Sequence, residues 1–400
     1  MANVSSSNGL EKRPKLRFPG FDEPYRKCRI GDIYTERSQR GAGDMELLSV
    51  TMNDGVMPRS EIEGKDNSSE DKSNYKVVCK GDMVYNSMRM WQGANGVSNY
   101  DGIVSPAYTV LMPTEEIDNQ YFAALFKTSN LINEFRKNSQ GLTSDTWNLK
   151  YPQIRAIRLY IPSLQEQHKI SSFIITLEER IEKQRQLVDV LKKYKRGLQN
   201  RFFFKHSQLS PKASEIDSHD VKPLGSVVHI NPKTGSLPEA FIYIDLECVE
   251  SGVLNSKKLI SRNSAPSRAQ RLLEEGDLLY QMVRPYQKNN YYFQKGFEYP
   301  AVASTGYAQI RCSEMDSKFI YEQLSSDYFA REAMLRSTGT GYPAINADDL
   351  AEIPIWVPSL VQQEKIGAAL SFLGEKIEVH QKLLSALCCV KSSLLQQLLI

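Results

Sequence analysis

A ten-residue sequence occurs twice in the chain, in two related versions. The first version is Ile161-Pro162-Ser163-Leu164-Gln165-Glu166-Gln167-His168-Lys169-Ile170, and the second is Val357-Pro358-Ser359-Leu360-Val361-Gln362-Gln363-Glu364-Lys365-Ile366. The two versions are offset by 196 residues, from Ile170 to Ile366, and their Pro, Ser, Leu, Gln, Lys and Ile coincide. A repeat at a fixed offset indicates a duplicated structural unit. The chain is therefore predicted to contain two related modules.

Further matches precede each copy and support the duplication. Gly81-Asp82-Met83-Val84-Tyr85 corresponds to Gly276-Asp277-Leu278-Leu279-Tyr280, and Arg89 and Arg284 follow these runs at the same distance. The residues between the matches differ, so the two modules are expected to have diverged interiors.

A long helix is predicted after each copy. Apolar residues recur in steps of four and three, and polar residues interrupt this seam at matching places, Gln184 and Lys195 in the first helix and His380 and Lys391 in the second. Such spacing over more than four heptads is typical of a coiled coil. We expect the two helices to pair with each other in an antiparallel coiled coil; the alternative is that each lies on its own domain's core. The seam residues are Ile170, Ile174, Leu177, Ile181, Val188, Leu191, Leu198, Phe202, Ile366, Leu370, Leu373, Ile377, Leu384, Leu387, Leu394 and Leu398.

Between the helices, each module has short β-like runs and one helical segment. The runs are Tyr75–Val78, Asp82–Tyr85 and Ala107–Leu111, then Phe241–Leu246, Asp277–Tyr280 and Tyr307–Arg311; the helical segments are Asn119–Asn138 and Ser317–Ser337. This pattern predicts an α+β fold in which two tandem α/β modules, each with a twisted antiparallel sheet, are separated by the two long helices. The predicted segments are a polar N-terminal segment 1–21, module 1 at 22–160, a helix at 161–205, a linker at 206–221, module 2 at 222–356 and a helix at 357–400.

The composition is that of a globular protein, with 41% hydrophobic and 24% charged residues in a chain of 400. No apolar run reaches the roughly 18 residues that a membrane-spanning helix needs. The net charge of +3 neither requires nor excludes a nucleic-acid partner, because a local basic patch can bind one. The six cysteines and five histidines show no zinc-binding spacing, which favours reduced thiols in a cytoplasmic protein without a bound metal.

Two fragments could suggest catalysis, and neither is complete. Ser105-Pro106-Ala107-Tyr108 resembles the loop with which amino-methyltransferases hold a base, but it lacks the second proline, and no glycine-rich turn follows a strand. Asp54, Glu63 and Lys65 have the loose spacing of a metal-dependent nuclease, but they lie in a polar stretch that is typical of a solvated loop. We therefore expect no catalytic residues in this chain.

The duplicated Pro-Ser-Leu-x-x-Gln element, each copy followed by a heptad helix, resembles the specificity subunits of type I restriction-modification enzymes. The run Pro14-Lys15-Leu16-Arg17-Phe18-Pro19-Gly20-Phe21 and the two Gly-Asp elements are also similar to that family, and the resemblance covers nearly the whole chain. It implies two target-recognition domains, each of which reads one half of a bipartite, asymmetric site in double-stranded DNA.

The resemblance also implies partners and a role for the helices. Two modification (methyltransferase) subunits would dock on the helical pair and bind S-adenosylmethionine themselves, and two restriction (translocase-nuclease) subunits would use ATP and Mg²⁺, so no cofactor is expected on this chain. The helical pair would set the spacer: residues 170 to 202 span about 48 Å as a helix, which corresponds to roughly 14 base pairs. The alternatives are a coiled-coil adaptor that binds only proteins and, as an enzyme, a standalone nuclease or methyltransferase.

Candidate DNA-binding residues follow a strand or the helical segment in each module. Arginine suits guanine and Asn or Gln suits adenine, whereas Lys and hydroxyl groups suit phosphates. The candidates are Asn86, Arg89, Trp91, Gln92, Thr143, Ser144, Asn148 and Lys150 in module 1, and Gln281, Arg284, Tyr286, Lys288, Thr340, Tyr342 and Asn346 in module 2. The alternative for Arg89 and Arg284 is a structural pairing with Asp82 or Asp277.

Two helix surfaces outside the seam are further candidates. The first helix ends in a basic run that is either solvated or in contact with the DNA backbone or a partner subunit: Lys192, Lys193, Lys195, Arg196, Arg201 and Lys205. Leu187 and Leu383 are candidates for apolar contacts with partner subunits.

Overall fold

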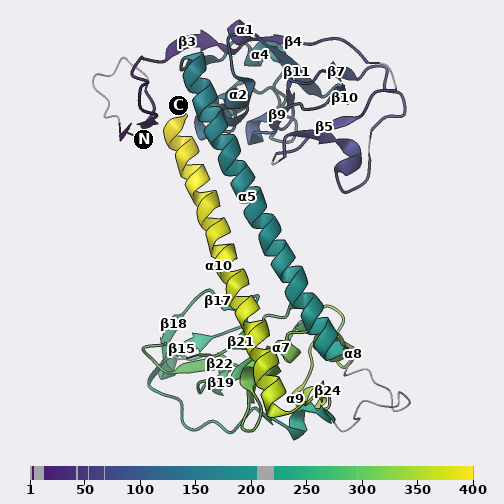
Figure 1. Cartoon of the computed structure of the whole chain (residues 1–400), viewed down its shortest axis with the longest axis vertical. Coiled ribbons are helices and arrows are strands. Elements are labelled where there is room, and N and C mark those ends of the chain that lie inside the picture. The colour runs from purple at the N-terminus through teal and green to yellow at the C-terminus, as the bar shows by residue number, and fades with distance from the viewer. Residues whose placement is uncertain are drawn as a thin grey trace. The chain divides into compact units, whose positions relative to one another are not determined.

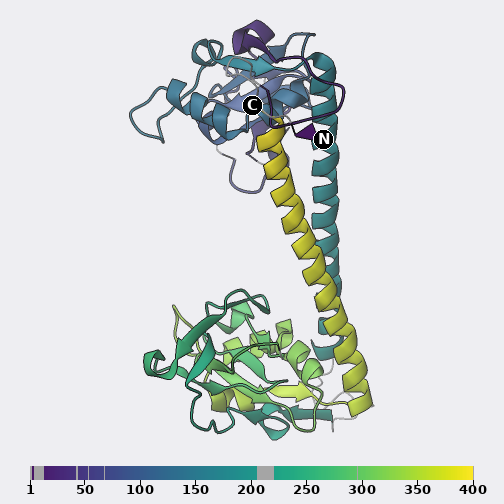
Figure 2. The same cartoon turned by 90° about the vertical axis from the view of Figure 1, so that its left-hand side faces the viewer.

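A computed structural model describes residues 2–3, 13–41, 44–52, 54–66, 68–204, 220–294 and 296–399. The chain divides into two compact units, Met1–Gln184 with Leu383–Ile400 as unit 1 and Arg185–Lys382 as unit 2. Each unit combines one module with segments of two long helices, α5 (Leu164–Gln199) and α10 (Leu360–Leu398), which are teal and yellow in Figures 1 and 2.

The module of unit 1 is built on a four-stranded antiparallel sheet with the strand order β4-β11-β8-β9. Smaller antiparallel pairs accompany it: β1 with β2, β3 with β12, β5 with β6 and β7 with β10. The strands are β1 (Ala2–Asn3), β2 (Leu16–Arg17), β3 (Arg26–Arg29), β4 (Tyr34–Glu36), β5 (Leu48–Val50), β6 (Val56–Pro58), β7 (Lys76–Val78), β8 (Met83–Asn86), β9 (Asn95–Val97), β10 (Gly102–Val104), β11 (Tyr108–Pro113) and β12 (Arg158–Ile161). The helices and 3-10 turns are α1 (Ile30–Ile33), η1 (Arg59–Glu61), η2 (Met90–Gln92), α2 (Asn119–Leu125), α3 (Ser129–Asn138) and α4 (Tyr151–Ile154).

Unit 2 repeats the main sheet of unit 1, with the strand order β14-β23-β20-β21. It adds a second sheet, β18-β15-β22-β19, in which β15 and β22 are parallel although the prediction was antiparallel throughout. The strands are β13 (Val221–Pro223), β14 (His229–Ile230), β15 (Ala240–Ile244), β16 (Val249–Glu250), β17 (Val253–Leu254), β18 (Lys258–Ser261), β19 (Ala269–Leu272), β20 (Leu278–Gln281), β21 (Tyr291–Tyr292), β22 (Ala301–Ser304), β23 (Tyr307–Arg311) and β24 (Pro354–Trp356). The helices and 3-10 turns are η5 (Leu224–Ser226), η6 (Arg262–Ser264), η7 (Pro285–Gln287), α7 (Ser317–Leu324), α8 (Asp327–Leu335) and α9 (Ala347–Ala351).

The single helix predicted in each module is in fact two. In unit 1, α2 ends near Thr128, which precedes α3, and in unit 2, α7 ends before Ser326, which precedes α8. Both hydroxyls donate to a carbonyl three residues earlier, Thr128 to Leu125 at 2.8 Å and Ser326 to Gln323 at 2.7 Å. A hydroxyl that bonds to nearby backbone competes with the helix, which explains a break at the same place in both copies.

The long helices begin three residues later than predicted. In the first copy, Ile161 is the last residue of β12 and pairs with Arg26 of β3. The backbone nitrogen of Gln167 donates to the carbonyl of Ser163. In the second copy, Ser359 accepts in the same way from Gln362 and Gln363. The serine of the motif is therefore the capping position immediately before each helix, and the proline precedes it.

Two predicted boundary segments differ from the structure. Residues 205–219, which make up nearly all of the predicted linker 206–221, lie outside the described residues, and Val221 already belongs to β13. The N-terminal segment 1–21 was predicted to be polar and separate, but Arg17 is buried in unit 1. Its buried partner, Glu166, explains why a charged residue can lie inside the unit.

The end of each long helix completes the core of the module encoded by the other half of the chain. Leu398, the last residue of α10, and Leu399, which follows it, are buried with Ile170 of α5 in the core of unit 1. In unit 2, α5 continues into a π-helical segment, η3 (Asn200–Phe204), whose Phe203 is buried with Leu370 of α10. Within each unit the two helices therefore run antiparallel, side by side (Figures 1 and 2).

The residues of the predicted seam are all buried or half-buried. The two lysines that interrupt the seam form ion pairs, but with different elements. Lys391 Nζ lies 2.6 Å from Glu178 Oε1 of α5 in unit 1, whereas Lys195 Nζ lies 2.8 Å from Glu322 Oε1 of α7 in unit 2. The two lysine interruptions are thus ionic contacts made inside each unit.

Among the described residues, no helix combines the length and the apolar character that crossing a membrane requires. All six cysteines carry free thiols, and burial raises the pKa of Cys28 and of Cys312 to about 11.

Candidate nucleic-acid interface

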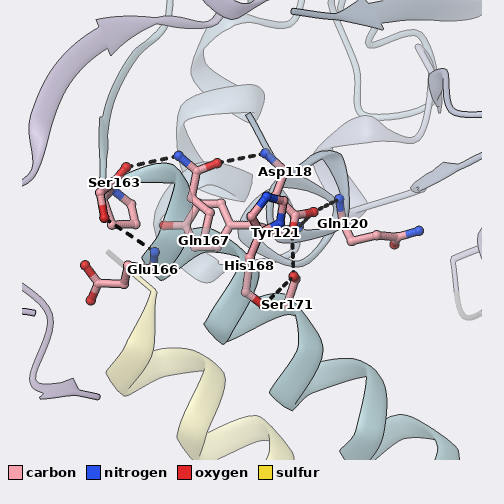
Figure 3. Close-up of polar contacts among 9 residues, drawn as sticks. Asp118, Gln120, Tyr121, Ser163, Glu166, Gln167, His168 and Ser171 are labelled. Carbon is pink, nitrogen blue, oxygen red and sulfur yellow. Dashed lines mark hydrogen bonds and ion pairs between the residues drawn. The ribbon is translucent and has the colours of Figure 1, made fainter. Parts of the chain in front are cut away.

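The repeated motif fastens each long helix to its module through one glutamine. In unit 1, Gln167 Nε2 donates to the carbonyl of Pro162 at 3.0 Å, and its Oε1 accepts from the backbone nitrogen of Asp118 at 3.0 Å (Figure 3). In unit 2, Gln363 makes the same two bonds, to Pro358 at 2.7 Å and from Asp316 at 3.1 Å. Both glutamines are buried, so the side chain satisfies two backbone groups that water does not reach. The motif thereby fixes the helix against the segment that leads into α2 or α7.

The aspartate at this joint caps the next helix. In unit 1, the carboxylate of Asp118 accepts from the backbone nitrogens of Gln120 and Tyr121, and from Ser171 Oγ at 2.5 Å, and lies 2.8 Å from His168 Nδ1 (Figure 3). Burial alone would raise the pKa of Asp118, but the bonds from Ser171, His168 and the two backbone groups outweigh burial and lower the pKa.

Lowering the pH should therefore remove the stabilisation that the Asp118 carboxylate gives unit 1. Because its pKa is lower in the folded state than in the unfolded chain, the stabilisation is complete above about pH 5 and is lost as the pH falls through the lowered pKa. We expect the difference in unfolding free energy between wild type and Asp118→Asn to be constant above about pH 5 and to shrink between about pH 5 and about pH 3.

Urea titrations at several pH values would measure this difference. In a Trp356→Phe background the two remaining tryptophans, Trp91 and Trp147, both lie in unit 1 and report its unfolding by fluorescence. Glu115→Gln, which changes an exposed carboxyl group of the same module, is the control and should show no convergence. A difference for Asp118→Asn that stays constant over the whole range would contradict the prediction.

In module 1 the two candidate loops lie against each other. The turn after β8 and the segment after α3 are joined by a bond from the Leu149 backbone nitrogen to the Ser87 carbonyl at 2.8 Å. Trp91 of the first loop meets Trp147 of the second edge-to-face, with ring centroids 5.2 Å apart, and the guanidinium of Arg136 lies 5.9 Å from the Trp91 ring. Trp147 was missed by the sequence analysis, where its only signal is an aromatic residue in a polar loop.

The candidate side chains of module 1 differ in their exposure. The exposed ones are Arg89, Gln92, Thr143, Ser144 and Lys150. Asn86, Trp91 and Asn148 are half-buried. Asn86 Oδ1 accepts from the backbone nitrogen of Met88 at 3.0 Å, so this oxygen supports the turn.

In module 2 the two candidate loops are joined in the same way. The backbone nitrogen of Arg284 donates to the Pro343 carbonyl at 2.7 Å, and that of Ile345 donates to the Met282 carbonyl at 3.1 Å. The guanidinium of Arg284 stacks on the ring of Tyr342, 4.2 Å from its centroid. Such stacking on an aromatic face leaves the edge of a guanidinium open to hydrogen-bond acceptors.

Three candidates of module 2 are engaged within the protein. Gln281 is 3% exposed, and its amide donates to Gln287 Oε1 and accepts from the backbone of Asn289. Asn346 caps α9. Lys288 pairs with the carboxylate of Asp327. The exposed candidates are Tyr286, Thr340 and Tyr342, and Arg284 is half-buried.

The alternative pairing for the two repeated arginines is wrong. The buried carboxylate of Asp82 pairs with Arg37, at 2.7 and 3.0 Å, and that of Asp277 pairs with Arg311, at 2.8 Å for both bonds. Arg89 lies in neither pair and is exposed. The repeated Gly-Asp elements are therefore structural, because their aspartates also accept from the backbone nitrogens of their own turns.

The basic end of α5 is only partly solvated. Lys195 pairs with Glu322, and Arg196 Nε lies 2.5 Å from Asp327 Oδ2 of α8. Lys192, Lys193 and Arg201 are exposed, and Lys205 lies outside the described residues. Charge complementarity within unit 2 thus accounts for two of these six cations.

The fragment that suggested a nuclease is not assembled as one. Asp54 lies in the turn between β5 and β6, where its backbone nitrogen donates to Thr51 Oγ1. Glu63 and Lys65 follow η1 in a loop. A magnesium-dependent nuclease needs such residues on paired strands, and none of these three lies on a strand.

Comparison with known proteins identifies the family. The family model described as the type I restriction modification DNA specificity domain matches the chain twice, at residues 24–192 and 220–387. The chain belongs to this family. A curated relative, the type I restriction enzyme MjaVIII specificity subunit of Methanocaldococcus jannaschii, is 23% identical over 335 residues, which are 78% of this chain and 78% of that protein.

Two solved structures have the same fold. The crystal structure of a type I restriction-modification system S subunit from M. genitalium superposes with a TM-score of 0.62 and 17% identity, over 97% of this chain and 99% of that one. A chain from a structural account of complex assembly and conformational transition of the type I R-M system gives a TM-score of 0.53 and 15% identity, over 96% and 98%. The two family domains and the helices that follow them agree with the duplication found in the sequence.

Proposed function

We propose that this chain is the DNA-recognition subunit of a cytoplasmic type I restriction-modification complex. Each module reads one half of a bipartite, asymmetric site, and the two long helices set the spacer between the halves. The observation that carries the proposal is that two loops lie against each other in each module. In module 1 they are the turn after β8 and the loop after α3, and in module 2 they are the turn after β20 and the loop after α8. The side chains on these two platforms differ, so the two half-sites should differ as well.

The exposed side chains suit the edges of bases and the phosphates. In module 1, Arg89 can donate two bonds to guanine and Gln92 can pair with adenine, while Lys150 and the hydroxyls of Thr143 and Ser144 can contact phosphates. The edge-to-face pair of Trp91 and Trp147 stiffens the platform on which these residues lie.

In module 2, Arg284 is the residue that we propose as the main base contact. Its stacking on Tyr342 fixes the plane of the guanidinium, which is the geometry that two parallel bonds to guanine require. Tyr286 and Thr340 are exposed beside it on the two joined loops. Gln281, Lys288 and Asn346 support the loops instead, because their polar atoms are engaged within the module.

Apolar residues on the outer faces of the helices support docking of protein partners. On α5 they are Leu187, Val190 and Tyr194, which are 39%, 60% and 57% exposed, and on α10 they include Val379 and Leu383, at 64% and 40%. Apolar groups in such a row, outside the seam, are typical of interaction surfaces. We propose that two methyltransferase subunits bind here and supply S-adenosylmethionine and the chemistry, and that two translocase-nuclease subunits add ATP-dependent cleavage with Mg²⁺.

Exchange of one module would test the proposal. The chain is produced in cells with its cognate methyltransferase subunit, and the methylated DNA motif is mapped before and after residues 22–160 are replaced by those of another family member. We expect one half of the motif to change completely while the other half and the spacer stay the same. The unmodified chain is the control.

The competing function is a coiled-coil adaptor that binds only proteins, and the same experiment separates the two. An adaptor gives no split motif, or an exchange that alters both halves, and either result would overturn independent reading by the modules. A DNA reader should also lose affinity steeply as salt rises, because counterions are released from the phosphates on binding.

A further inference from the structure

The carboxylate of Asp327 lies between the turn of module 2 that follows β20 and the helix α5. Its Oδ1 accepts from Lys288 Nζ at the end of the turn, and its Oδ2 accepts from Arg196 Nε of α5 at 2.5 Å. Asp327 is the first residue of α8 and is rigidly placed there, because Ser326 caps that helix. One side chain thus joins three elements of unit 2.

The turn that Asp327 holds is strained. Arg284 and Lys288, which flank η7, have φ values of 56° and 53°, in the left-handed region that residues with a Cβ rarely adopt. Module 1 uses a glycine at the corresponding end of its turn, Gly93, with φ of 86°. A strained backbone persists only where its surroundings impose it, and such strain collects at functional sites.

The contacts of Lys288 show what imposes this conformation. Its backbone nitrogen closes the turn by donating to the Pro285 carbonyl at 3.1 Å, and its side chain is held by Asp327. The turn carries Arg284, whose Nε is buried and has no hydrogen-bond partner among the described residues. A shift of the turn would therefore move the guanidinium that stacks on Tyr342.

We propose that Asp327 is a positioning residue for DNA recognition by module 2. Through Lys288 it holds the turn 284–288 in the conformation that presents Arg284 and Tyr286, and through Arg196 it fastens that turn to α5. This inference rests on the proposed function. Asp327 and Lys288 are each 30% exposed and Arg196 is 70% exposed. Ion pairs that solvent reaches add little to overall stability, so the main effect of these two pairs is on the placement of the turn.

The test uses the assembled complex with methyltransferase subunits and compares methylation of the recognised site with sites altered by one base pair in either half. We expect Asp327→Ala to reduce discrimination in the half-site read by module 2 by about tenfold, the order of one misplaced base contact. Discrimination in the other half-site should not change. Arg196→Gln should act on the same half-site in the same direction, by a smaller factor, since the Lys288 contact remains.

A second change separates positioning from direct contact. Glycine adopts the left-handed conformation without strain, so adding Lys288→Gly to Asp327→Ala should restore discrimination to within about threefold of wild type, because the turn no longer needs the clamp. Glu332→Gln is the matched control: it removes a carboxylate from the same helix, α8, where it pairs with Arg336 and not with the turn.

Three outcomes would overturn the inference. Asp327→Ala could discriminate both half-sites as well as wild type, it could impair both halves equally, or the added Lys288→Gly could worsen recognition, which would place Lys288 itself on the DNA. A wild-type complex that recognises no bipartite site would instead overturn the proposed function, and this inference with it. The first measurement on wild type therefore distinguishes the two failures.

Discussion

Replacing Glu166 with alanine should lower the unfolding free energy of unit 1 by about 3–5 kcal/mol, the cost of leaving a buried charge without its partner. Glu166 Oε1 accepts from Arg17 Nε at 2.8 Å, and its Oε2 accepts from Arg17 Nη2 at 2.7 Å. The two side chains are only 1% and 5% exposed, so solvent cannot replace the lost contact. An arginine side chain keeps its proton without a carboxylate partner, so Arg17 stays charged in the variant.

Urea unfolding of unit 1, followed through Trp91 and Trp147 in the Trp356→Phe background, would measure the loss. Replacing both partners with apolar residues, Arg17→Met with Glu166→Leu, should recover most of the stability, because no buried charge is left unpaired.

The exposed pair of Arg26 and Glu116 provides the matched control for the buried pair. Its side chains are 53% and 78% exposed, so Glu116→Gln should change stability by less than about 1 kcal/mol. A loss of similar size for Glu166→Ala would contradict the prediction that the buried pair is the more important of the two.

Gly367→Ala should destabilise unit 2 by about 1–3 kcal/mol, as overpacking does, although alanine is the better helix former by about 1 kcal/mol. A Cβ at this position of α10 would lie 2.5 Å from Asp316 Oδ1 and 2.7 Å from the backbone nitrogen of Phe319. Those two atoms are hydrogen-bonded to each other at the capped start of α7. Neither of them can move away from the new Cβ alone without breaking that bond. The glycine is thus required by close approach of two helices.

Gly374 on the same helix is the control for this prediction. A Cβ there would meet only Lys195 Nζ, at 2.9 Å, which is the end of a flexible side chain. Gly374→Ala should therefore be neutral or stabilising by up to about 1 kcal/mol. Unfolding of unit 2 is measured through Trp356 after Trp91 and Trp147 are changed to phenylalanine. If Gly367→Ala is as stable as Gly374→Ala, the two helices do not approach as closely as described.

Unit 1 solves the same packing problem in another way. Ser171 stands 196 residues before Gly367, and its hydroxyl bonds to Asp118, the counterpart of Asp316. Because one copy has a serine and the other a glycine at this position, a comparison of the two copies does not reveal that the helix is closely packed there. By helix propensity alone a glycine at position 367 only weakens α10, whereas the close approach of Asp316 makes it necessary.

The buried aspartates of the Gly-Asp elements show a second limit of sequence reasoning. Asp82 and Asp277 were matched correctly, but their partners, Arg37 and Arg311, come from different positions of the sheet. Arg37 follows β4, whereas Arg311 ends β23, and no fixed spacing connects either arginine to its aspartate. Such pairs depend on which strands become neighbours, so the repeated Arg89 and Arg284 were plausible partners until the sheet was known.

The duplication, the two long helices with their apolar seam, the two central strands of each main sheet and the family could be predicted from the sequence, whereas the outer strands of those sheets could not. These features are local or periodic, and burial of one helix face or one side of a strand leaves a pattern in the chain. The groups that meet across the fold could be found only in the structure: Arg17 with Glu166, Trp91 with Trp147, Arg284 with Tyr342, and Asp327 with both Lys288 and Arg196. Each of these contacts joins segments whose separation in sequence is arbitrary, because loop lengths between secondary structure elements are free to vary while the packing that unites them is not.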